Sequence, residues 1–377
     1  MKQLLAYAMF AGGVIGVGVF GLPYVLIRAG LLPTLLLTVL VLLIVWVSHL
    51  AYAEVVLRTK GKKRLPGYVG TYLGKSGFLL AAVANVLGFI GALLAYGIVG
   101  GHFVSLAIAP WVHIAPGMAT LLYFAVGAVI LLWGVKQLPA IQLVIVGLFL
   151  VTLVVLGGAT FPQFSANELP IIGPSSERLL PYGVLLFAFW GLALIPELME
   201  LSGRRMGAVR RVLAWSIVTA TVTYALFAIM VAGVSGRETT EDALLGIAGT
   251  VGPGVLLLSA FFGILTTFSS FLALGLTLIR TLMYDFRLRS FSAWSLAIAS
   301  PVALYLLGVQ QFVRVLSVTG AVFVGLEGLL VLATFWVMKR GRSREGGALA
   351  SPVLLAVLSV LLLGGVVAEV VRVLGTR

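Results

Sequence analysis

Long apolar stretches, separated by short polar segments, run through nearly the whole chain. These stretches lack the alternation of apolar and polar residues that is typical of a strand, and only helices or closed barrels satisfy their backbone hydrogen bonds in lipid. A helix needs about 20 residues to cross the hydrocarbon core. The pattern therefore predicts one all-α integral membrane domain over residues 1–377, with about eleven spans. We place these spans at 5–27, 32–56, 76–103, 117–134, 140–160, 179–201, 211–235, 253–283, 291–308, 312–338 and 350–373.

Three polar segments between the spans carry further expectations. Residues 161–178 are rich in Pro, Ser and Asn, which indicates the connection between two halves of the chain. Residues 66–74 are too short and too polar to cross a membrane, and we expect a small interfacial helix there. Residues 237–250 are expected to form a short polar helix on the outer surface, with Thr239 or Thr240 as its cap.

The composition excludes several classes of protein. Hydrophobic residues make up 61% of the 377 residues and charged residues 10%, against roughly 45–50% and about 25% in soluble domains. A soluble enzyme, a disordered chain and a secreted disulfide scaffold do not have such a composition. Cysteine is absent, so the chain offers no disulfide framework and no thiolate metal site. We find no metal-ligand spacing, nucleotide-binding loop or nucleophile–base set, and we expect neither an enzyme nor a bound cofactor.

The distribution of basic residues predicts the orientation in the membrane. The formal net charge is +13, from 25 Lys and Arg against 12 Asp and Glu. With the N-terminus in the cytoplasm, nineteen basic residues fall in inside segments and six in outside segments. Cytoplasmic loops of membrane proteins are enriched in Lys and Arg. We therefore expect a protein of the cytoplasmic (inner) membrane with its N-terminus inside and its C-terminus outside. The expected partner is then the lipid bilayer and not a nucleic acid.

The first span contains an unusual cluster of glycines. Ala11–Pro23 has the sequence AGGVIGVGVFGLP, with five glycines and one proline. Each glycine costs about 1 kcal/mol against alanine in a helix and an interior proline about 3, so a continuous helix is disfavoured by roughly 8 kcal/mol. Unwound backbone at membrane depth is tolerated only where protein buries it or where it lines a cavity. We expect this helix to break near Gly16–Gly18, and the break to line a binding site.

The sixth span carries a second candidate break. Phe187–Pro196 has the sequence FAFWGLALIP, and Gly191–Pro196 matches the G-x-x-x-[LI]-P pattern of Gly18–Pro23 at an offset of 173 residues. Five spans precede the second half, so the two copies would enter the membrane from opposite sides. This predicts an inverted repeat over 5–160 and 179–338, with an extra helix at 350–373. The structural alternative is that these glycines only allow close helix packing.

Broken helices suit a substrate that carries both charges. Freed amides at the positive end of a half-helix bind a carboxylate, and freed carbonyls bind an amino group or a cation. An amino acid zwitterion has both groups. Tyr96 in the third span is a further candidate for the carboxylate, with packing as its alternative role. The candidate substrate-binding residues are Ile15, Gly16, Gly18, Phe20, Tyr96, Phe187, Phe189, Trp190 and Gly191.

Several segments together resemble a known family. Besides AGGVIGVGVFGLP, they are FAFWGLALIPELMEL (Phe187–Leu201), SSFLALGLTLIRTLMYDF (Ser269–Phe286) and SPVALYLLGVQQFVRVLSVTGAVF (Ser300–Phe323). In this order they are similar to the amino acid/auxin permease group of the amino acid–polyamine–cation superfamily, closest to the bacterial hydroxy and aromatic amino acid permeases. The resemblance implies a leucine-transporter-like fold of five plus five inverted helices with an added eleventh. It also implies secondary transport of amino acids coupled to Na⁺ or H⁺.

The resemblance also indicates where a coupling ion would bind. In the Na⁺-coupled relatives, a hydroxyl pair on the eighth span joins carbonyls of the broken first helix around sodium. Ser269 and Ser270 occupy the matching place, and Gly13 and Gly16 lie on the first helix. As an alternative, such hydroxyls commonly bond to carbonyls of their own helix. Independently of the resemblance, Glu327 near the middle of the tenth span is the candidate for proton coupling, because an acid there must be protonated, be paired or face water. The structural alternative is a protonated carboxyl group bonded to a neighbouring helix.

These observations predict a secondary active transporter that moves amino acids, or related small amines, by alternating access. The alternative is a membrane nutrient receptor of the same fold, of the spore-germination type, which binds an amino acid without moving it. The bacterial aromatic permeases usually carry a polar residue near the sixth-span glycine, whereas residues 190–194 here are apolar. The sequence therefore leaves the substrate open. It also leaves open Na⁺ against H⁺ coupling, the direction of flux and the oligomeric state. A monomer is compatible with the sequence.

Overall fold

The computed structural model describes residues 2–133, 138–340 and 351–375, and most of them are helical. The α-helices are α1 (Lys2–Val14), α2 (Gly18–Ala29), α3 (Leu31–Arg58), α4 (Leu65–Ile108), α5 (Pro116–Trp133), α6 (Leu138–Thr160), α7 (Leu180–Phe189), α8 (Ile195–Leu201), α9 (Met206–Ser235), α10 (Pro253–Tyr284), α11 (Ser290–Leu306), α12 (Phe312–Val318), α13 (Gly325–Arg340) and α14 (Pro352–Gly375). The short 3₁₀ turns are η1 (Phe161–Gln163), η2 (Ala166–Glu168), η3 (Leu192–Leu194), η4 (Gly236–Glu238) and η5 (Leu245–Ile247), and η6 (Thr319–Val324) is a π-helical segment.

Helical residues occupy every expected span. By length and apolarity, eight helices of the described residues could cross a membrane, and the bent pair formed by α1 and α2 makes nine. Two shorter apolar helices, Gly147–Gln163 and Ser290–Leu306, correspond to the fifth and ninth expected spans. The all-helical membrane class is therefore confirmed, while the total of eleven spans and the two repeat boundaries stay predictions.

The first span is broken where its glycines cluster. α1 ends at Val14 and α2 begins at Gly18, with a bend of 48° between the two helices. The regular backbone ladder ends with the bond from the Ile15 amide to the Ala11 carbonyl, at 2.8 Å. It resumes through tighter bonds, from Val19 to Gly16 at 3.3 Å and from Phe20 to Val17 at 3.2 Å. The expected break near Gly16–Gly18 is confirmed.

The sixth span is broken in a similar way. α7 ends at Phe189, and Trp190 has an extended backbone with φ −83° and ψ 104°. Gly191 follows with φ −112° and ψ 19°, before the 3₁₀ turn η3 and the short helix α8. Pro196 lies in the first turn of α8, where its missing amide hydrogen removes no helical bond. The proline therefore restarts the helix, and Gly191 provides the interruption.

The two polar segments that were expected to form short helices differ in outcome. Gly74 has φ 69° and ψ −161°, so the first turns of α4 form a short separate helix before the main span, as expected for residues 66–74. Residues 237–250, by contrast, do not form the single polar helix that their composition suggests, but the two turns η4 and η5. The Asp242 side chain accepts bonds from the Thr240 hydroxyl (2.8 Å) and the Leu245 amide (3.2 Å), which stabilises a turn in place of a helix.

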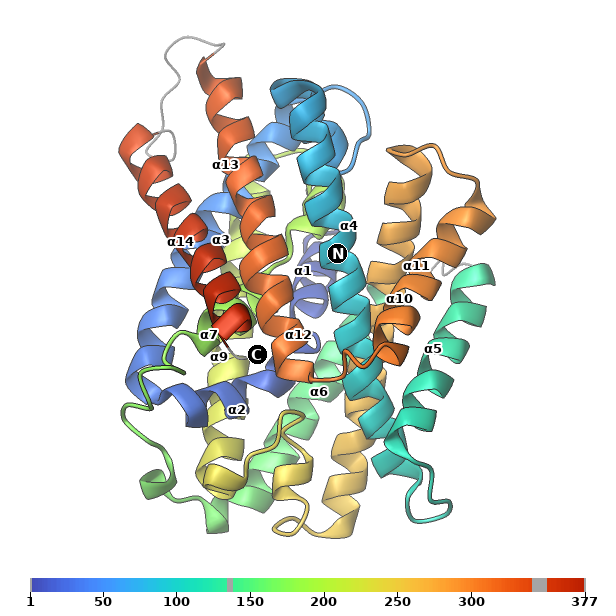
Figure 1. The fold of residues 1–377 in the computed structure, drawn as a ribbon, viewed down its shortest axis with the longest axis vertical. Helices are drawn as coiled ribbons and strands as arrows, with labels where there is room; N and C mark the ends of the chain where they lie inside the picture. The colour runs from blue at the N-terminus through green and yellow to red at the C-terminus, as the bar shows by residue number, and fades with distance from the viewer. Residues whose placement is uncertain (1, 134–137, 341–350, 376–377) are drawn as a thin grey trace.

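The two broken spans lie inside the bundle (Figure 1). α2 packs against α7 and α9, α1 packs against α6 and α9, and α7 packs against α3 and η6. In Figure 1 the loops 59–64 and 285–289 lie at the upper end of the molecule, and the loops 109–115 and 236–252 lie at the lower end. The helices that precede and follow each of these loops therefore run in opposite directions through the bundle.

An ion pair stabilises the upper end of the bundle, and backbone hydrogen bonds stabilise the lower end. At the upper end, Arg64 pairs with Glu197 of α8 at 2.6 Å. At the lower end, the segment after η2 lies along the junction of α2 and α3. Its Pro170 carbonyl accepts from the Leu31 amide at 2.8 Å, and its Gly173 amide donates to the Ala29 carbonyl at 2.8 Å.

Candidate functional site

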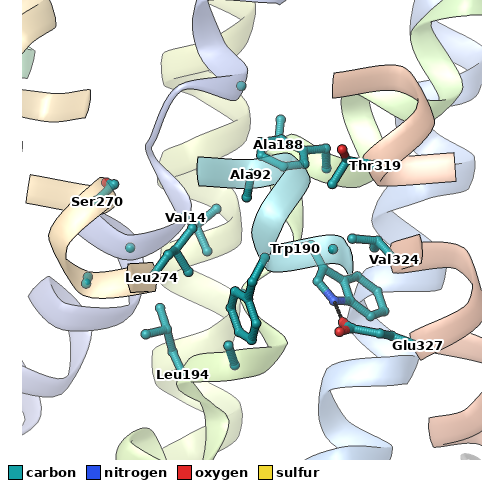
Figure 2. Close-up of a pocket in the computed structure, with 18 of the residues that line it drawn as sticks. Val14, Ala92, Ala188, Trp190, Leu194, Ser270, Leu274, Thr319, Val324 and Glu327 are labelled. Atoms are coloured by element: carbon teal, nitrogen blue, oxygen red, sulfur yellow. Dashed lines mark hydrogen bonds between the residues drawn. The ribbon is translucent and has the colours of Figure 1, made fainter. Parts of the chain in front are cut away.

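A cavity lies between the two breaks and is bordered by the tenth span (Figure 2). Its volume is about 70 Å³, whereas a dry cavity that binds benzene measures about 150 Å³. In this structure the cavity is therefore smaller than one aromatic ring requires. The lining residues are Gly13, Val14, Gly18, Asn85, Gly88, Phe89, Ala92, Tyr96, Phe187, Ala188, Trp190, Gly191, Ala193, Leu194, Ser270, Ala273, Leu274, Thr319, Val324 and Glu327.

The first break brings the end of α1 and the start of α2 to the cavity wall, through Gly13, Val14 and Gly18. Residues 16–18 carry amides that stand outside the helical ladder, at the N-terminal and therefore positive end of α2. Gly18 has to be glycine, because an added Cβ would lie 2.7 Å from the Cα of Ala188. α2 and α7 thus touch backbone to backbone beside the cavity.

A buried histidine supports the second break. The amide of Gly191, which the break frees, donates to His49 Nε2 at 3.0 Å. His49 Nδ1 lies 2.7 Å from the Val45 carbonyl, which can only accept, so this nitrogen carries the ring hydrogen. His49 is completely buried, and its ring packs edge-on against Trp190 at 5.2 Å between ring centroids. The hydrogen bonds at the two ring nitrogens fix a neutral imidazole on α3, and this ring accepts the bond from the Gly191 amide that the break frees.

Glu327 is the acidic side chain of the cavity wall. It is 6% exposed and lies in the first turn of α13. Its Oε1 accepts from the Asn85 side chain at 2.5 Å, and its Oε2 accepts from the Trp190 indole N–H at 2.8 Å. Figure 2 shows the indole of Trp190 directed at this carboxyl group. The second break is therefore connected to the tenth span through Trp190.

The π-helical segment η6 places Glu327 and packs on the second break. π-helical turns occur frequently at functional sites, and here Thr319 and Val324 at the two ends of η6 both line the cavity. An added Cβ at Gly320 would overlap the Gly183 carbonyl and lie 2.8 Å from the Phe187 amide. The tenth span thus meets α7 at backbone distance, just before the turn that carries Glu327.

The third and eighth spans contribute hydroxyl groups. Tyr96 and Ser270 line the cavity, and a Cβ at Gly16 would overlap the Tyr96 hydroxyl and lie 3.6 Å from Ser270 Oγ. The hydroxyls of Thr266 and Ser270 are buried without a hydrogen-bond partner among the described residues. Ser269 instead donates to the Thr266 carbonyl at 3.1 Å, the own-helix bond that was the alternative for this residue.

Some of the expected site residues line the cavity and others do not. Gly13, Gly18, Tyr96, Phe187, Trp190, Gly191, Ser270 and Glu327 are in its wall. Ile15, Gly16, Phe20, Phe189 and Ser269 are not. Phe20 packs against Phe103 and Phe227, with ring centroids 4.7 and 5.7 Å away. Phe189 packs against Tyr224 at 5.0 Å. Neighbouring residues of a helix face different sides, so each break directs only part of its side chains into the cavity.

Three polar residues at or beside the cavity had no role predicted from the sequence. Asn85 and His49 stand out in the sequence only as single polar residues in apolar spans, which is a weak signal for function. Their partners are 242 and 142 residues away along the chain. Thr319 likewise comes to the cavity through η6, and neither the hydropathy pattern nor the glycine clusters predict that π-helical segment. Chain separation of this size explains why these contacts were missed.

The cavity combines apolar walls with a few polar groups at defined places. Phe89, Leu194 and Leu274 supply apolar surface, and glycines and alanines leave room for a ligand beside them. Figure 2 shows Ser270 and Glu327 on opposite sides of this space. Small-molecule sites usually have this character, with apolar walls for affinity and a few polar groups for orientation. The arrangement suits a small molecule with an apolar body and charged ends.

Comparisons with known proteins agree with the geometry. The model of the tryptophan/tyrosine permease family matches residues 1–371. Among solved structures, MhsT in complex with L-phenylalanine is similar, with a TM-score of 0.69 and 16% identity over 97% of this chain and 98% of that chain. No curated protein shows a significant sequence match. The structural likeness confirms the expected leucine-transporter-like fold. The chain belongs to the tryptophan/tyrosine permease family and is a multi-pass membrane transporter of amino acids.

Proposed function

We propose that this protein moves aromatic amino acids across the inner membrane by alternating access around the cavity between the two breaks. The observation that carries the proposal is that both breaks, Tyr96 and Glu327 meet in the wall of one mostly apolar cavity. The description of the family and the L-phenylalanine bound to MhsT support the choice of an aromatic substrate.

Each part of an aromatic amino acid has a matching group in the wall. The positive end of α2 and the Tyr96 hydroxyl suit the carboxylate. The Glu327 carboxyl group suits the ammonium group, and Phe89, Phe187 and Leu274 suit the ring. Since the cavity is only about 70 Å³, the substrate must enter a more open form of the protein. The structure then corresponds to a closed form.

The inner route from this cavity ends at an ion pair. A second, smaller cavity shares Asn85, Phe89 and Ala193 with the first and extends to Arg64. Arg64 and Glu197 close this route at 2.6 Å. Burial disfavours the charged form of Arg64, but pairing with Glu197 outweighs that effect and leaves the pKa of the guanidinium above its ordinary value. We assign this pair to the inner gate.

Two groups of residues near the cavity are candidates for binding the ion that drives transport. Glu327 faces the cavity and can exchange a proton when Trp190 and Asn85 move, which supports H⁺ coupling. The buried hydroxyls of Thr266 and Ser270 lie free of hydrogen bonds in the described region, and hydroxyl and carbonyl oxygens are suitable ligands for Na⁺. The acid is directly in the cavity wall, and we therefore favour H⁺.

The charge at one end of the bundle supports the proposed orientation, with the N-terminus inside. The loops 59–64 and 285–289, which lie together at one end, carry most of their charge as Lys and Arg. Lys136, Arg342, Arg344 and Arg377, which also entered the count of charges, lie outside the described residues. Enrichment of basic residues supports a cytoplasmic position for that end.

Uptake into proteoliposomes tests the proposal. Radiolabelled L-tryptophan, L-tyrosine, L-phenylalanine and L-alanine are offered under an inward proton gradient, an inward Na⁺ gradient, and neither. We expect uptake of the three aromatic substrates that exceeds uptake of alanine and that requires the proton gradient. Saturable binding of the same substrates without uptake under any gradient would favour the receptor. Neither binding nor uptake would reject the proposed function.

Replacing Glu327 tests the coupling. In Glu327→Gln the side chain no longer releases a proton, although it keeps one oxygen acceptor for Asn85 or Trp190. We expect exchange of internal for external substrate to persist at saturating substrate with a raised KM, because the amide oxygen still accepts from the ammonium group, while accumulation driven by the proton gradient falls at least tenfold. An unchanged response to the proton gradient would show that Glu327 has a structural role only.

A further inference from the structure

One hydroxyl group joins the two breaks. Tyr224 lies on α9, outside both broken spans, and is 2% exposed. Its hydroxyl donates to the carbonyl of Val14, the last residue of α1, at 2.7 Å. The same hydroxyl lies 3.0 Å from the carbonyl of Ala188, next to the end of α7. Tyr224 is thus within hydrogen-bond distance of a backbone group from each break.

Both carbonyls need a partner that their own helices cannot supply. The last four carbonyls of a helix lack an amide four residues ahead, and they carry the negative end of the helix dipole. The chain unwinds directly after Val14 and after Phe189. Two such helix ends directed at one place repel each other unless a proton donor or a cation lies between them. A tyrosine hydroxyl has one proton, which the two carbonyls share.

We propose that Tyr224 is a positioning residue that holds the two breaks in register, and that its hydroxyl proton takes the place of a cation between them. The inference rests on the proposed function, because its consequence is read in substrate binding. Val14 and Ala188, whose carbonyls Tyr224 binds, both line the cavity. Loss of the hydroxyl therefore frees two parts of the cavity wall at the same time.

The chain offers a matched control on the same pair of helices. Tyr7 of α1 and Thr219 of α9 are joined by a hydrogen bond between their hydroxyls at 2.7 Å. Tyr7 is half-buried, and neither residue lines the cavity. Tyr7→Phe therefore removes one hydroxyl bond between α1 and α9 without touching either break. Tyr224→Phe removes the corresponding atom at the breaks.

The experiment compares substrate affinity with stability. Wild type, Tyr224→Phe and Tyr7→Phe are purified in detergent, and binding of L-phenylalanine, L-tyrosine and L-tryptophan and the melting temperature are measured on the monodisperse fraction. We expect both variants to melt slightly lower than wild type. Tyr224→Phe should raise the Kd of the bound substrates about tenfold, whereas Tyr7→Phe should leave it within twofold of wild type. A structural role alone would lower the melting temperature and leave the Kd of the folded fraction unchanged.

Further outcomes separate this inference from the proposed function. If wild type binds and transports but Tyr224→Phe has the wild-type Kd, or Tyr7→Phe weakens binding equally, the role of Tyr224 is refuted and the transporter stands. If wild type neither binds nor transports any amino acid, the proposed function itself fails. Should Tyr224→Phe not fold, Tyr224→His is used in its place, because the shorter histidine side chain carries an N–H that does not reach both carbonyls. A Kd raised at least threefold in this variant supports the role, and an unchanged Kd refutes it.

Discussion

At the scale of single residues, the glycines at the breaks differ in what surrounds them. At Gly18 an added Cβ meets the backbone of Ala188, which cannot move without shifting α7. At Gly191 it meets side-chain atoms, Phe10 Cζ at 2.7 Å and Val14 Cγ2 at 2.8 Å. Side-chain ends can rotate away, whereas backbone cannot. The two positions are therefore not equivalent, although they match in the sequence.

This difference predicts a graded effect of alanine substitution. Gly18→Ala should separate α2 from α7 and lower substrate affinity at least tenfold, while Gly191→Ala should lower it only a few-fold. Gly88→Ala is the control, since Gly88 lines the same cavity and its added Cβ would lie 3.5 Å from the nearest atom, Phe323 Cβ. The measurement is the KM for uptake by each purified variant. Equal KM values for Gly18→Ala and Gly88→Ala would contradict the predicted contact between α2 and α7.

Individual residues also show where inference from the sequence ends. The break at Gly16–Gly18 was predictable, because helix propensity is a local property that five nearby glycines change together. The contacts of His49, Asn85 and Tyr224 were not predictable, since each is made with a partner far away in the chain. The placement of Phe20 outside the cavity wall likewise depends on the bend at the break, which sets the direction of each following side chain.

At the scale of elements, the short helix α8 connects the second break to the upper end of the bundle. It follows η3 directly and presents Glu197 to Arg64 and Glu200 to Lys62. The two ion pairs differ in exposure. The Arg64 side chain is 13% exposed and that of Lys62 is 88% exposed. Exposed pairs contribute roughly 0–1 kcal/mol, whereas removing one partner of a buried pair leaves a costly unpaired charge. We therefore expect the Arg64–Glu197 pair, and not the Lys62–Glu200 pair, to keep the upper end of the bundle closed.

The contrast between the two pairs gives a prediction for the inner gate. Thr277 lines the small cavity below Arg64, and a cysteine introduced there reports access from the inner side. Added to Thr277→Cys, Glu197→Gln should raise the rate of maleimide labelling severalfold, because the closing ion pair is lost. Glu200→Gln in the same background is the control and should leave the rate unchanged. Equal labelling rates in both variants would argue against a gate at Arg64 and Glu197.

Elements differ in how well the sequence predicts them. Every expected span coincides with helical residues, because a long apolar run has few alternatives in lipid. Residues 237–250 were wrongly expected to form one helix, since side-chain bonds to Asp242 stabilise turns there. The π-helical segment η6 was not predicted either. Both features depend on hydrogen bonds that a hydropathy pattern does not contain.

At the scale of the whole molecule, the absence of cysteine makes the proposed orientation directly testable. Single cysteines introduced at Lys62 and at Ser175 lie in the loops on either side of the bundle. In intact cells a membrane-impermeant maleimide should label Ser175→Cys and should label Lys62→Cys only after permeabilisation. The cysteine-free wild type provides the background. The reverse pattern would show that the basic end faces outward, against the expected N-in topology.

The contact between Gly18 and Ala188 also has a consequence for how the molecule moves. Because the backbones of α2 and α7 touch and Tyr224 bonds the end of α1 to α7, we expect these helices to tilt together and not to slide past each other. α2 and α7 would then form one rigid pair, relative to which the surrounding helices move. We expect spin labels on α2 and α7 to keep a constant separation through the transport cycle, while labels on α4 and α10 move relative to them.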